Sequence, residues 1–349
     1  MKRLRVLIVE DSVTVRKRLC EVLGNDDGIE VVGEAVDGKQ AVDLCLALRP
    51  DVISLDMILP VMSGLSATEC IMAYCPTPIL VVSSSFNRGE LFKSYEALAA
   101  GAVDLLEKPR DDDVDGNWAR NYIATLKLVA RVKVVTHLRA RLRASRALPP
   151  AVIDAPMRAR NCQVVAIGAS TGGPGAIVDV LKGLPPEFCL PLLIVIHLNA
   201  PFDTAFAEWL DAQTDRKVSI AVAGQSIDKS RVYLAPSGQH LTVHKRRLQL
   251  SDEAPRLSCR PSIDVLFESI AADYGSAATA CLLTGMGQDG ARGMLALRQA
   301  GALTIAQDEA TSVIYGMPRE AVLMGAVQRV LPLSEIAPVL AALVQKDAP

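Results

Sequence analysis

The sequence predicts an α/β protein with two doubly wound domains whose sheets are mainly parallel. Short apolar runs rich in Val, Ile and Leu recur along the chain, and stretches with helical periodicity separate them. Many of these runs stop abruptly at acids, hydroxyl residues or glycines, and open parallel sheets bind their ligands at the carboxyl ends of the strands. The chain has 349 residues, a length that corresponds to about two domains.

The composition fits a globular protein with aliphatic cores, because 50% of the residues are hydrophobic and only 4% are aromatic. A net charge of −2 argues against a nucleic-acid-binding protein that depends on a positive field. The eight cysteines form no Cys-x-x-Cys pair, so we expect reduced, buried thiols. The N-terminal apolar run is too short for a signal peptide, and no run reaches about 18 residues, so we expect a cytoplasmic protein without membrane insertion.

The first domain, residues 1–125, should alternate strands with helices. Leu4–Val9 is a continuous apolar run, which is typical of a strand buried on both faces of a parallel sheet. Helices are expected at Ser12–Leu23 and Gly38–Leu48. Further strands are predicted at Val31–Val36, Val52–Leu55, Ile79–Val82 and Val103–Leu106, which gives five β-α units in this domain.

Polar residues follow these strands at equivalent positions. Glu10 and Asp11 come after the first strand, Asp56 after the third, Ser83 after the fourth and Lys108 after the fifth. Any one of them could be a solvated loop residue, but together they would converge at one edge of the sheet. Clustered carboxylates need a cation, and hard oxygen ligands suit Mg²⁺. A hydroxyl and a lysine nearby suit a phosphoryl group held against that metal.

These residues resemble the signature of response-regulator receiver domains, and the resemblance covers about residues 1–125. It implies that Asp56 accepts a phosphoryl group from a histidine kinase. It also implies that Glu10, Asp11 and Asp56 hold Mg²⁺. Glu10 stands where many receivers carry a second aspartate, a change that keeps the negative charge.

The same resemblance assigns roles to two further residues. Ser83 would move toward the phosphoryl oxygen, and Lys108 would pair with that oxygen. The peptide bond between Lys108 and Pro109 is often cis in this family, so we expect a cis bond there.

Residues 126–160 are predicted to form a helical, proline-containing linker. Helical composition extends from Trp118 to about Arg143, and Lys127–Arg146 carries many basic residues and no acid. This basic stretch could bind an acidic partner or nucleic acid, but a solvated helix face followed by a linker is the favoured interpretation. Prolines at 149 and 150 stiffen its end.

The second domain, residues 161–347, begins with a strand at Val164–Ile167 that runs into a glycine-rich turn containing Ser170. From this stretch alone, Ser170 could cap the next helix, help to cradle a phosphate or act as a nucleophile. The next buried run, Leu192–Ile196, ends in His197. Other strands are expected at Arg231–Ala235, at Leu241–Leu250 with a turn around Lys245–Arg247, and at Ala277–Leu283. Other helices are expected at Gly172–Leu181, Ser262–Tyr274 and Ala291–Ala300.

A third polar group follows a strand in the same way, because a glycine-rich turn after Ala277–Leu283 carries Asp289. Asp289 could do no more than cap the following helix. Ser170, His197 and Asp289 are, however, the residue types that serve as a nucleophile, a general base and the acid that orients the base. Their order differs from that of the α/β-hydrolases, and no G-x-S-x-G elbow is present. Nucleotide binding is the alternative, although the chain has neither G-x-G-x-x-G nor a Walker lysine.

The remaining histidines of this domain, His240 and His244, end no buried run, so we expect them at the surface or at the rim of the substrate site.

Several long motifs of the second domain resemble the chemotaxis protein-glutamate methylesterase family. They are Gly168–Pro174, Ile196-His197, Pro261–Phe267, Leu283–Gly290, Ala306–Thr311 and Tyr315–Arg319. After His197 the chain has Leu198-Asn199-Ala200-Pro201 in place of the family's usual short Met-Pro.

The resemblance implies a serine esterase that removes γ-methyl esters from glutamates of methyl-accepting chemoreceptors and deamidates selected glutamines. It implies that the Met286 N–H helps to bind the oxyanion and that Thr171 supports the histidine side of the site. The esterase reaction would need no cofactor, and the protein should be a monomer. A receiver joined to a hydrolase suggests that the unphosphorylated receiver covers the active site. The opposed hypothesis is a non-enzymatic response regulator whose second domain binds a nucleotide or a protein.

Overall fold

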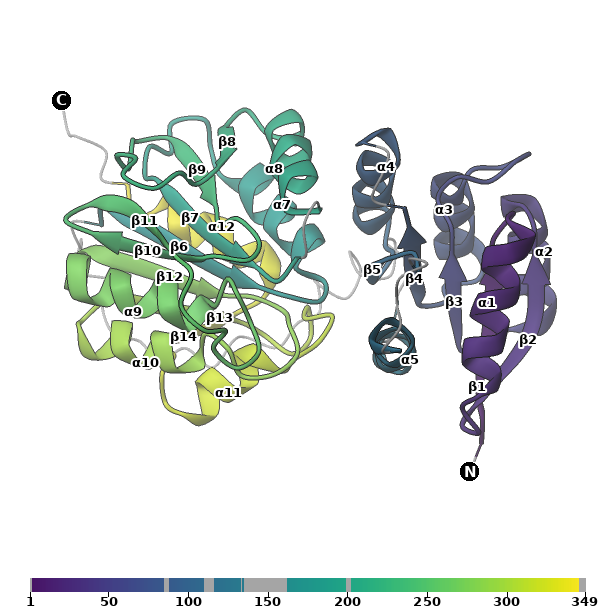
Figure 1. Ribbon diagram of the computed structural model, residues 1–349. Coiled ribbons are helices and arrows are strands. Elements are labelled where there is room, and N and C mark those ends of the chain that lie inside the picture. Colours follow the sequence, from purple (N-terminus) through teal and green to yellow (C-terminus); the bar gives the residue numbers. More distant parts are fainter. Residues whose placement is uncertain are drawn as a thin grey trace. The chain divides into compact units, whose positions relative to one another are not determined.

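The computed structural model in Figure 1 describes residues 2–84, 88–109, 116–132, 134, 162–198 and 202–344. The chain divides into two compact units, Met1–Ala147 and Leu148–Pro349. Within the described residues, no helix is both long enough and apolar enough to cross a membrane.

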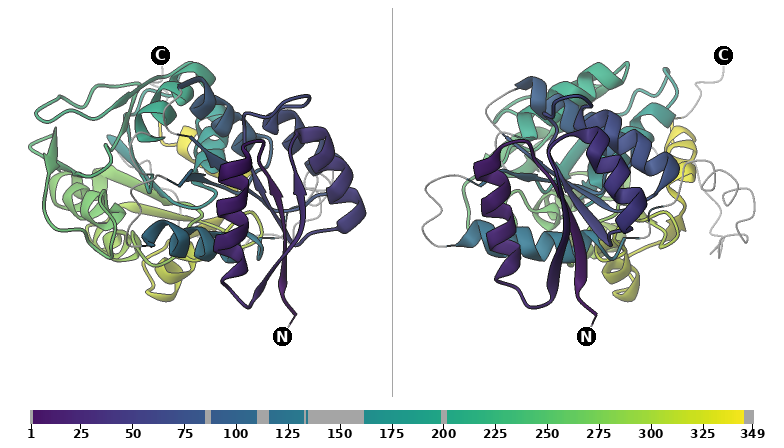
Figure 2. Two further views of the ribbon diagram at one scale, coloured as in Figure 1. Left: turned by 45° about the vertical axis from the view of Figure 1, so that its right-hand side comes forward. Right: turned by 90° about the vertical axis from the view of Figure 1, so that its right-hand side faces the viewer.

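The first unit is a five-stranded parallel sheet with the strand order β2-β1-β3-β4-β5. Helix α1 packs near α5, whereas α2 packs against α3 and α3 against α4, so helices cover both faces of the sheet (Figure 2). This is the predicted doubly wound arrangement. The strands are β1 (Leu4–Val9), β2 (Ile29–Ala35), β3 (Val52–Leu55), β4 (Ile79–Ser83) and β5 (Asp104–Glu107), and the helices are α1 (Val13–Gly24), α2 (Gly38–Leu48), α3 (Gly64–Tyr74), α4 (Arg88–Ala99) and α5 (Asn117–Val129).

Local sequence explains where these helices begin. The Ser12 hydroxyl accepts a hydrogen bond from the Val15 N–H at the start of α1, and the Asp37 carboxylate accepts one from Gln40 N–H at the start of α2. Strand β1 lies between β2 and β3, and its last four residues are fully buried apolar residues. The strand order therefore reverses beside β1, which places a ligand crevice at the carboxyl ends of β1 and β3.

The second unit has a seven-stranded parallel sheet with the order β14-β13-β12-β6-β7-β9-β8 and a separate antiparallel hairpin, β10-β11. This hairpin is the strand run predicted at Leu241–Leu250, and it turns around Lys245–Arg247 as predicted. The strands are β6 (Val164–Ala169), β7 (Leu192–Ile196), β8 (Lys217–Ile220), β9 (Arg231–Leu234), β10 (His240–His244), β11 (Arg247–Ser251), β12 (Ala278–Leu282), β13 (Leu303–Gln307) and β14 (Arg329–Leu331).

The helices of the second unit lie on both faces of its sheet. Helix α9 packs against α10, which also contacts α11, whereas α7 contacts both α8 and α12. The hairpin packs on α9, and its apolar side chains join the core on that face. The helices are α7 (Gly173–Gly183), α8 (Phe202–Gln213), α9 (Ile263–Tyr274), α10 (Ala291–Gln299), α11 (Met317–Leu323) and α12 (Leu333–Ala341).

Close packing explains the glycines around β6. A Cβ on Gly168 would lie 2.4 Å from Cγ2 of Ile263 in α9, so only glycine lets this helix approach the strand. Gly172 has φ +76°, and a Cβ there would lie 2.5 Å from Cβ of Val313. The turn after β6 is therefore fixed by backbone conformation as well as by space.

The peptide bond between Lys108 and Pro109 is not cis, so the prediction for this bond was wrong. The cis bond of the described chain joins Arg260 to Pro261.

The helix predicted to begin at Trp118 is α5, which starts at Asn117 and ends at Val129. Most of the predicted basic stretch at 127–146 lies outside the described residues.

Candidate functional site

The three residues predicted to act together in the second unit follow neighbouring strands. Ser170 follows β6 and His197 follows β7, and the register pairs Ala169 with Ile196 directly before them. The His197 N–H donates to the Ala169 carbonyl at 3.2 Å. Strand β12, which precedes the Asp289 turn, pairs with β6 on its other side. Sheet register therefore brings three distant segments to one edge.

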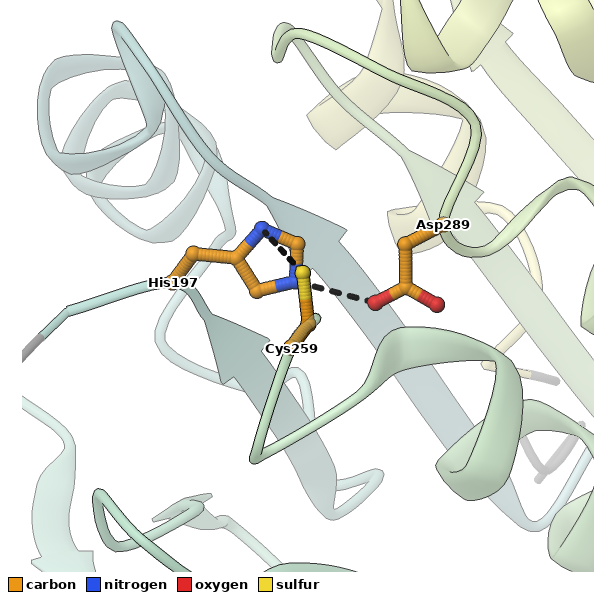
Figure 3. Close-up of side chains that lie close together, drawn as sticks. All are labelled: His197, Cys259 and Asp289. Carbon is orange, nitrogen blue, oxygen red and sulfur yellow. Dashed lines mark hydrogen bonds and ion pairs between the residues drawn. The ribbon is translucent and has the colours of Figure 1, made fainter. Parts of the chain in front are cut away.

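His197 and Asp289 are joined directly by a hydrogen bond of 2.9 Å between Nε2 and Oδ2 (Figure 3). Asp289 is only 3% exposed. Its carboxylate also accepts hydrogen bonds from the N–H of Ile263 at 2.7 Å, the hydroxyl of Ser262 at 2.7 Å and the N–H of Asp264 at 3.1 Å. The start of α9 therefore surrounds the carboxylate with donors.

These donors keep Asp289 ionised. Burial raises the pKa of Asp289, but the hydrogen bond and charge of His197 and the donors of Ile263 and Ser262 outweigh it, so the pKa lies below its ordinary value. A carboxylate without a proton can accept the Nε2 proton of the imidazole. Nδ1 of neutral His197 is then the nitrogen with a free lone pair.

His240 lies behind this carboxylate and not at the surface, so the sequence-based expectation for it was wrong. It is 1% exposed, and its Nδ1 accepts the N–H of Ser262 at 3.1 Å. Because a backbone N–H can only donate, Nδ1 carries no proton and Nε2–H donates to the Ala254 carbonyl at 3.2 Å. His240 thus positions Ser262, which in turn binds Asp289. His244, at the other end of β10, is exposed as expected.

Ser170 itself is held by its backbone. Its N–H donates to the Thr284 carbonyl at 3.0 Å, and its carbonyl accepts from Gly173 N–H. Among the described residues, no hydrogen bond joins Ser170 Oγ to His197. Free enzymes often form this contact only when substrate is bound.

The loop after β12 lies against Ser170. A Cβ on Gly285 would be 2.7 Å from Cβ of Ser170, so a side chain there would displace the serine. The Gly285 carbonyl accepts from Met317 N–H at 2.9 Å, which holds the loop in place. The next residue, Met286, has a side chain that is 58% exposed, and the described part of the chain offers its N–H no acceptor. This N–H is therefore free to bind a ligand oxygen beside Ser170.

In the described structure, the side-chain hydrogen bond to Thr171 comes from this loop, and none joins Thr171 to the imidazole. It is buried, and its carbonyl accepts the hydroxyl of Thr284 at 3.0 Å. Thr284 N–H donates in turn to the side chain of Gln307 at 2.9 Å. The described contacts of Thr171 therefore place it on the Met286 side of Ser170.

The polar residues of the first unit gather at the carboxyl ends of β1, β3 and β5. Lys108 Nζ lies 2.9 Å from Asp56 Oδ2 and 3.0 Å from Glu10 Oε2. One carboxylate oxygen from each of Glu10, Asp11 and Asp56 lies within 4.8 Å of the others. Asp56 Oδ1 accepts from Met57 N–H at 2.7 Å, which leaves Oδ2 on the side of Lys108. The structure thus brings four of the predicted residues together.

Ser83 belongs to the same strand ends, because the Lys108 N–H donates to its carbonyl at 2.9 Å. Its hydroxyl, however, donates to Glu90 Oε1 at 2.9 Å. The same oxygen accepts Ser84 N–H at 2.7 Å, and Glu90 is buried in the first turn of α4. Glu90 was not predicted, and it holds the hydroxyl that the resemblance directs toward the phosphoryl group.

Two family models match this chain. One, described as CheB methylesterase, covers residues 165–340, and the other, described as response regulator receiver domain, covers residues 6–114. The chain belongs to the CheB methylesterase family. This membership and the two-sheet α/β fold confirm the corresponding predictions from the sequence, and they do not favour the nucleotide-binding alternative.

Relatives of this CheB family member match over nearly its whole length. It is 43% identical to "Protein-glutamate methylesterase/protein-glutamine glutaminase 2" of Anaeromyxobacter dehalogenans over 333 residues, which cover 95% of each chain. It is 41% identical to "Protein-glutamate methylesterase/protein-glutamine glutaminase 1" of Syntrophus aciditrophicus. This match covers 99% of this chain and 100% of the relative. The solved CheB methylesterase catalytic domain of Thermotoga maritima is 32% identical, covers 52% of this chain and 99% of that chain, and has a TM-score of 0.51.

The carboxylates of the CheB receiver fit a divalent cation. Burial and the charge of Asp56 raise the pKa of Glu10 to about 7 although Lys108 lowers it, and burial raises the pKa of Asp56 as well. Oε2 of Glu10 is buried, and its partner within the described chain is the ammonium of Lys108 at 3.0 Å. A hard cation among these oxygens would relieve both the repulsion and the burial cost, as Mg²⁺ does in all-oxygen sites.

Proposed function

We propose that this chain hydrolyses γ-methyl esters of glutamate in methyl-accepting chemoreceptors and releases methanol. Its relatives are named protein-glutamate methylesterases, which supports the ester-hydrolysing reaction. The imidazole–carboxylate pair of His197 and Asp289, beside Ser170 at adjacent strand ends, is the observation that carries this proposal. Deamidation of glutamine needs the same groups with ammonia as the leaving group, so we include it.

The reaction begins when Ser170 Oγ attacks the ester carbonyl and His197 Nδ1 takes the hydroxyl proton. The imidazolium is stabilised by Asp289, which keeps the Nε2 proton hydrogen-bonded. The oxyanion of the tetrahedral intermediate accepts the Met286 N–H, and such a donor is worth about 3–4 kcal/mol of barrier.

Collapse of this intermediate breaks the bond to the methoxy oxygen, which leaves as methanol with the proton from His197. The product is a glutamyl ester of Ser170. Water then attacks this acyl group with His197 as the base, and a second tetrahedral intermediate releases free glutamate and restores the Ser170 hydroxyl.

The pH dependence of this reaction is set by the pKa of the general base, His197. Burial lowers the pKa of His197, but the hydrogen bonds and charges of Asp289 and Cys259 outweigh it and raise the pKa to about 9. Since only the neutral imidazole accepts the serine proton, we expect kcat/KM to rise about tenfold per pH unit below that value and to level off above it.

The measurement is kcat/KM for methanol release between pH 6 and 10, with a Ser170→Ala blank that corrects for spontaneous ester hydrolysis. A profile that is flat from pH 7 to 9 would contradict a general base whose pKa is raised to about 9.

We propose that the receiver regulates this activity. A histidine kinase, or a small donor such as acetyl phosphate, transfers a phosphoryl group to Asp56, and Lys108 pairs with the new charge. Glu10, Asp11 and Asp56 would hold the Mg²⁺ that neutralises the phosphoryl oxygens during transfer. Phosphorylation then shifts the population toward the active form, and Ser83 would have to leave Glu90 to reach the phosphoryl group.

The experiment that tests both proposals measures methanol release from methylated chemoreceptors with and without acetyl phosphate and Mg²⁺. Asp56→Asn should abolish the stimulation by acetyl phosphate, because asparagine cannot accept the phosphoryl group. Were Asp56→Asn alone to raise the rate to the phosphorylated level, occlusion by the unphosphorylated receiver would be contradicted. No methanol release under any condition would favour the non-enzymatic regulator.

A further inference from the structure

A second group of metal-ligating atoms lies in the second unit, at the imidazole itself. Cys259 Sγ lies 3.8 Å from His197 Nδ1, in front of the imidazole ring in the view of Figure 3. Ligand atoms of His197, Cys259 and Asp289 all lie within 4.8 Å of one another. In the described residues, the other such group is the all-oxygen cluster of the receiver.

The thiol is held in this position by the turn that carries it. The backbones of Arg256 and Cys259 exchange hydrogen bonds of 3.1 and 2.9 Å. The Arg256 guanidinium makes two hydrogen bonds to Glu268 in α9, at 2.5 and 2.8 Å. The turn is therefore fixed to α9, the helix whose first residues bind Asp289.

We propose that Cys259 Sγ and His197 Nδ1 form a binding site for a soft divalent cation, with Zn²⁺ as the best fit, and that this cation inhibits the esterase. Thiolate and imidazole ligands select zinc over magnesium or calcium, which prefer oxygen. On binding, the thiol loses its proton to solvent and a sulfur–zinc bond forms. Water completes the coordination.

Asp289 supports this site through the other nitrogen of the imidazole. A histidine that binds zinc through one nitrogen almost always donates the other N–H to a carboxylate or carbonyl. His197 Nε2 has this partner in Asp289 at 2.9 Å, so the lone pair of the neutral imidazole is on Nδ1. The imidazole therefore already has the carboxylate partner that histidine ligands of zinc usually have.

Inhibition follows because one nitrogen serves both purposes. In the proposed function, His197 Nδ1 takes the proton of Ser170, and a nitrogen that binds a cation cannot do so. This half of the inference rests on the proposed esterase activity, whereas binding of the cation does not.

Binding is tested with Co²⁺ on the full chain in excess Mg²⁺, because a cobalt–thiolate bond gives a charge-transfer absorption that oxygen ligands do not. We expect this absorption in the wild type and its loss on addition of Zn²⁺. Cys259→Ala should lower the affinity by more than about 100-fold, whereas Cys189→Ala, at another half-buried thiol of this unit, should change nothing. An absorption that persists in Cys259→Ala overturns the site.

The second arm measures methanol release. Zn²⁺ should inhibit the wild type and Cys189→Ala, a chelator should restore activity, and Cys259→Ala should stay active at the same Zn²⁺ concentration. Equal inhibition of Cys259→Ala overturns the inhibitory role. A wild type that binds Co²⁺ through the thiol but releases no methanol without metal would instead contradict the proposed function.

Discussion

Ser170→Ala is expected to lower methanol release by a factor on the order of 10⁴ or more, because no other group can form the acyl-enzyme. The hydrogen bonds that hold Ser170 in the described chain are made by its backbone, to Thr284 and Gly173, and alanine keeps them. The substitution should therefore leave the fold intact. The measurement is the rate of methanol release together with incorporation of phosphate at Asp56 from acetyl phosphate.

A matched control for this variant is Ser219→Ala. Ser219 lies in β8 at the edge of the same sheet, and its buried hydroxyl has no hydrogen-bond partner in the described structure. We expect this variant to keep full activity, because its hydroxyl holds nothing in place. An active Ser170→Ala protein would remove the nucleophile from the mechanism. Loss of both methanol release and phosphorylation would indicate misfolding.

Asp289→Asn is expected to lower kcat by about 10⁴-fold, the loss seen when the acid of such a triad is made neutral. Asparagine cannot stabilise the imidazolium, and its NH₂ group would face donors such as Ile263 N–H. The pKa of His197 should fall, since the carboxylate is one cause of its rise to about 9. The rising part of the pH profile should therefore move to lower pH.

Asp264→Asn provides the control for this second prediction. Asp264 is a buried acid at the start of the same helix, and its Oδ1 accepts Gly293 N–H at 2.7 Å. It is not hydrogen-bonded to His197 in the described structure. We expect this variant to lose stability in thermal unfolding and to keep the wild-type pH profile. A profile that moves equally in both variants would show that Asp289 acts only through packing.

The sequence predicted the main elements because their signals are local. Leu192–Ile196 is an apolar run with sharp ends, and the structure has a strand with these bounds followed directly by His197. Parallel pairing then places such strand ends together, so the convergence of distant segments could be inferred from topology alone. Strand bounds differ from the predicted ones by a residue or two at β2 and β5.

The supporting contacts could not be predicted in this way. His240 lies 22 residues from Ser262 in the sequence, and its position at the first residue of a hairpin gave no sign of burial. Glu90 has the sequence context of an ordinary acid in the first turn of a helix, although it holds Ser83. Cys259 approaches His197 only through the tertiary fold. Side-chain partners of this kind depend on how helices and strands pack against one another, and the hydrophobic periodicity of the sequence does not specify that packing.

The carboxylate of Asp289 makes the orientation of the catalytic imidazole depend on the docking of α9. It accepts the first free N–H groups of α9 and orients His197 with the same two oxygens. A chain in which this helix has come away from the sheet loses the anchor of its imidazole at the same moment. We therefore expect copies in which α9 has not docked to lack esterase activity.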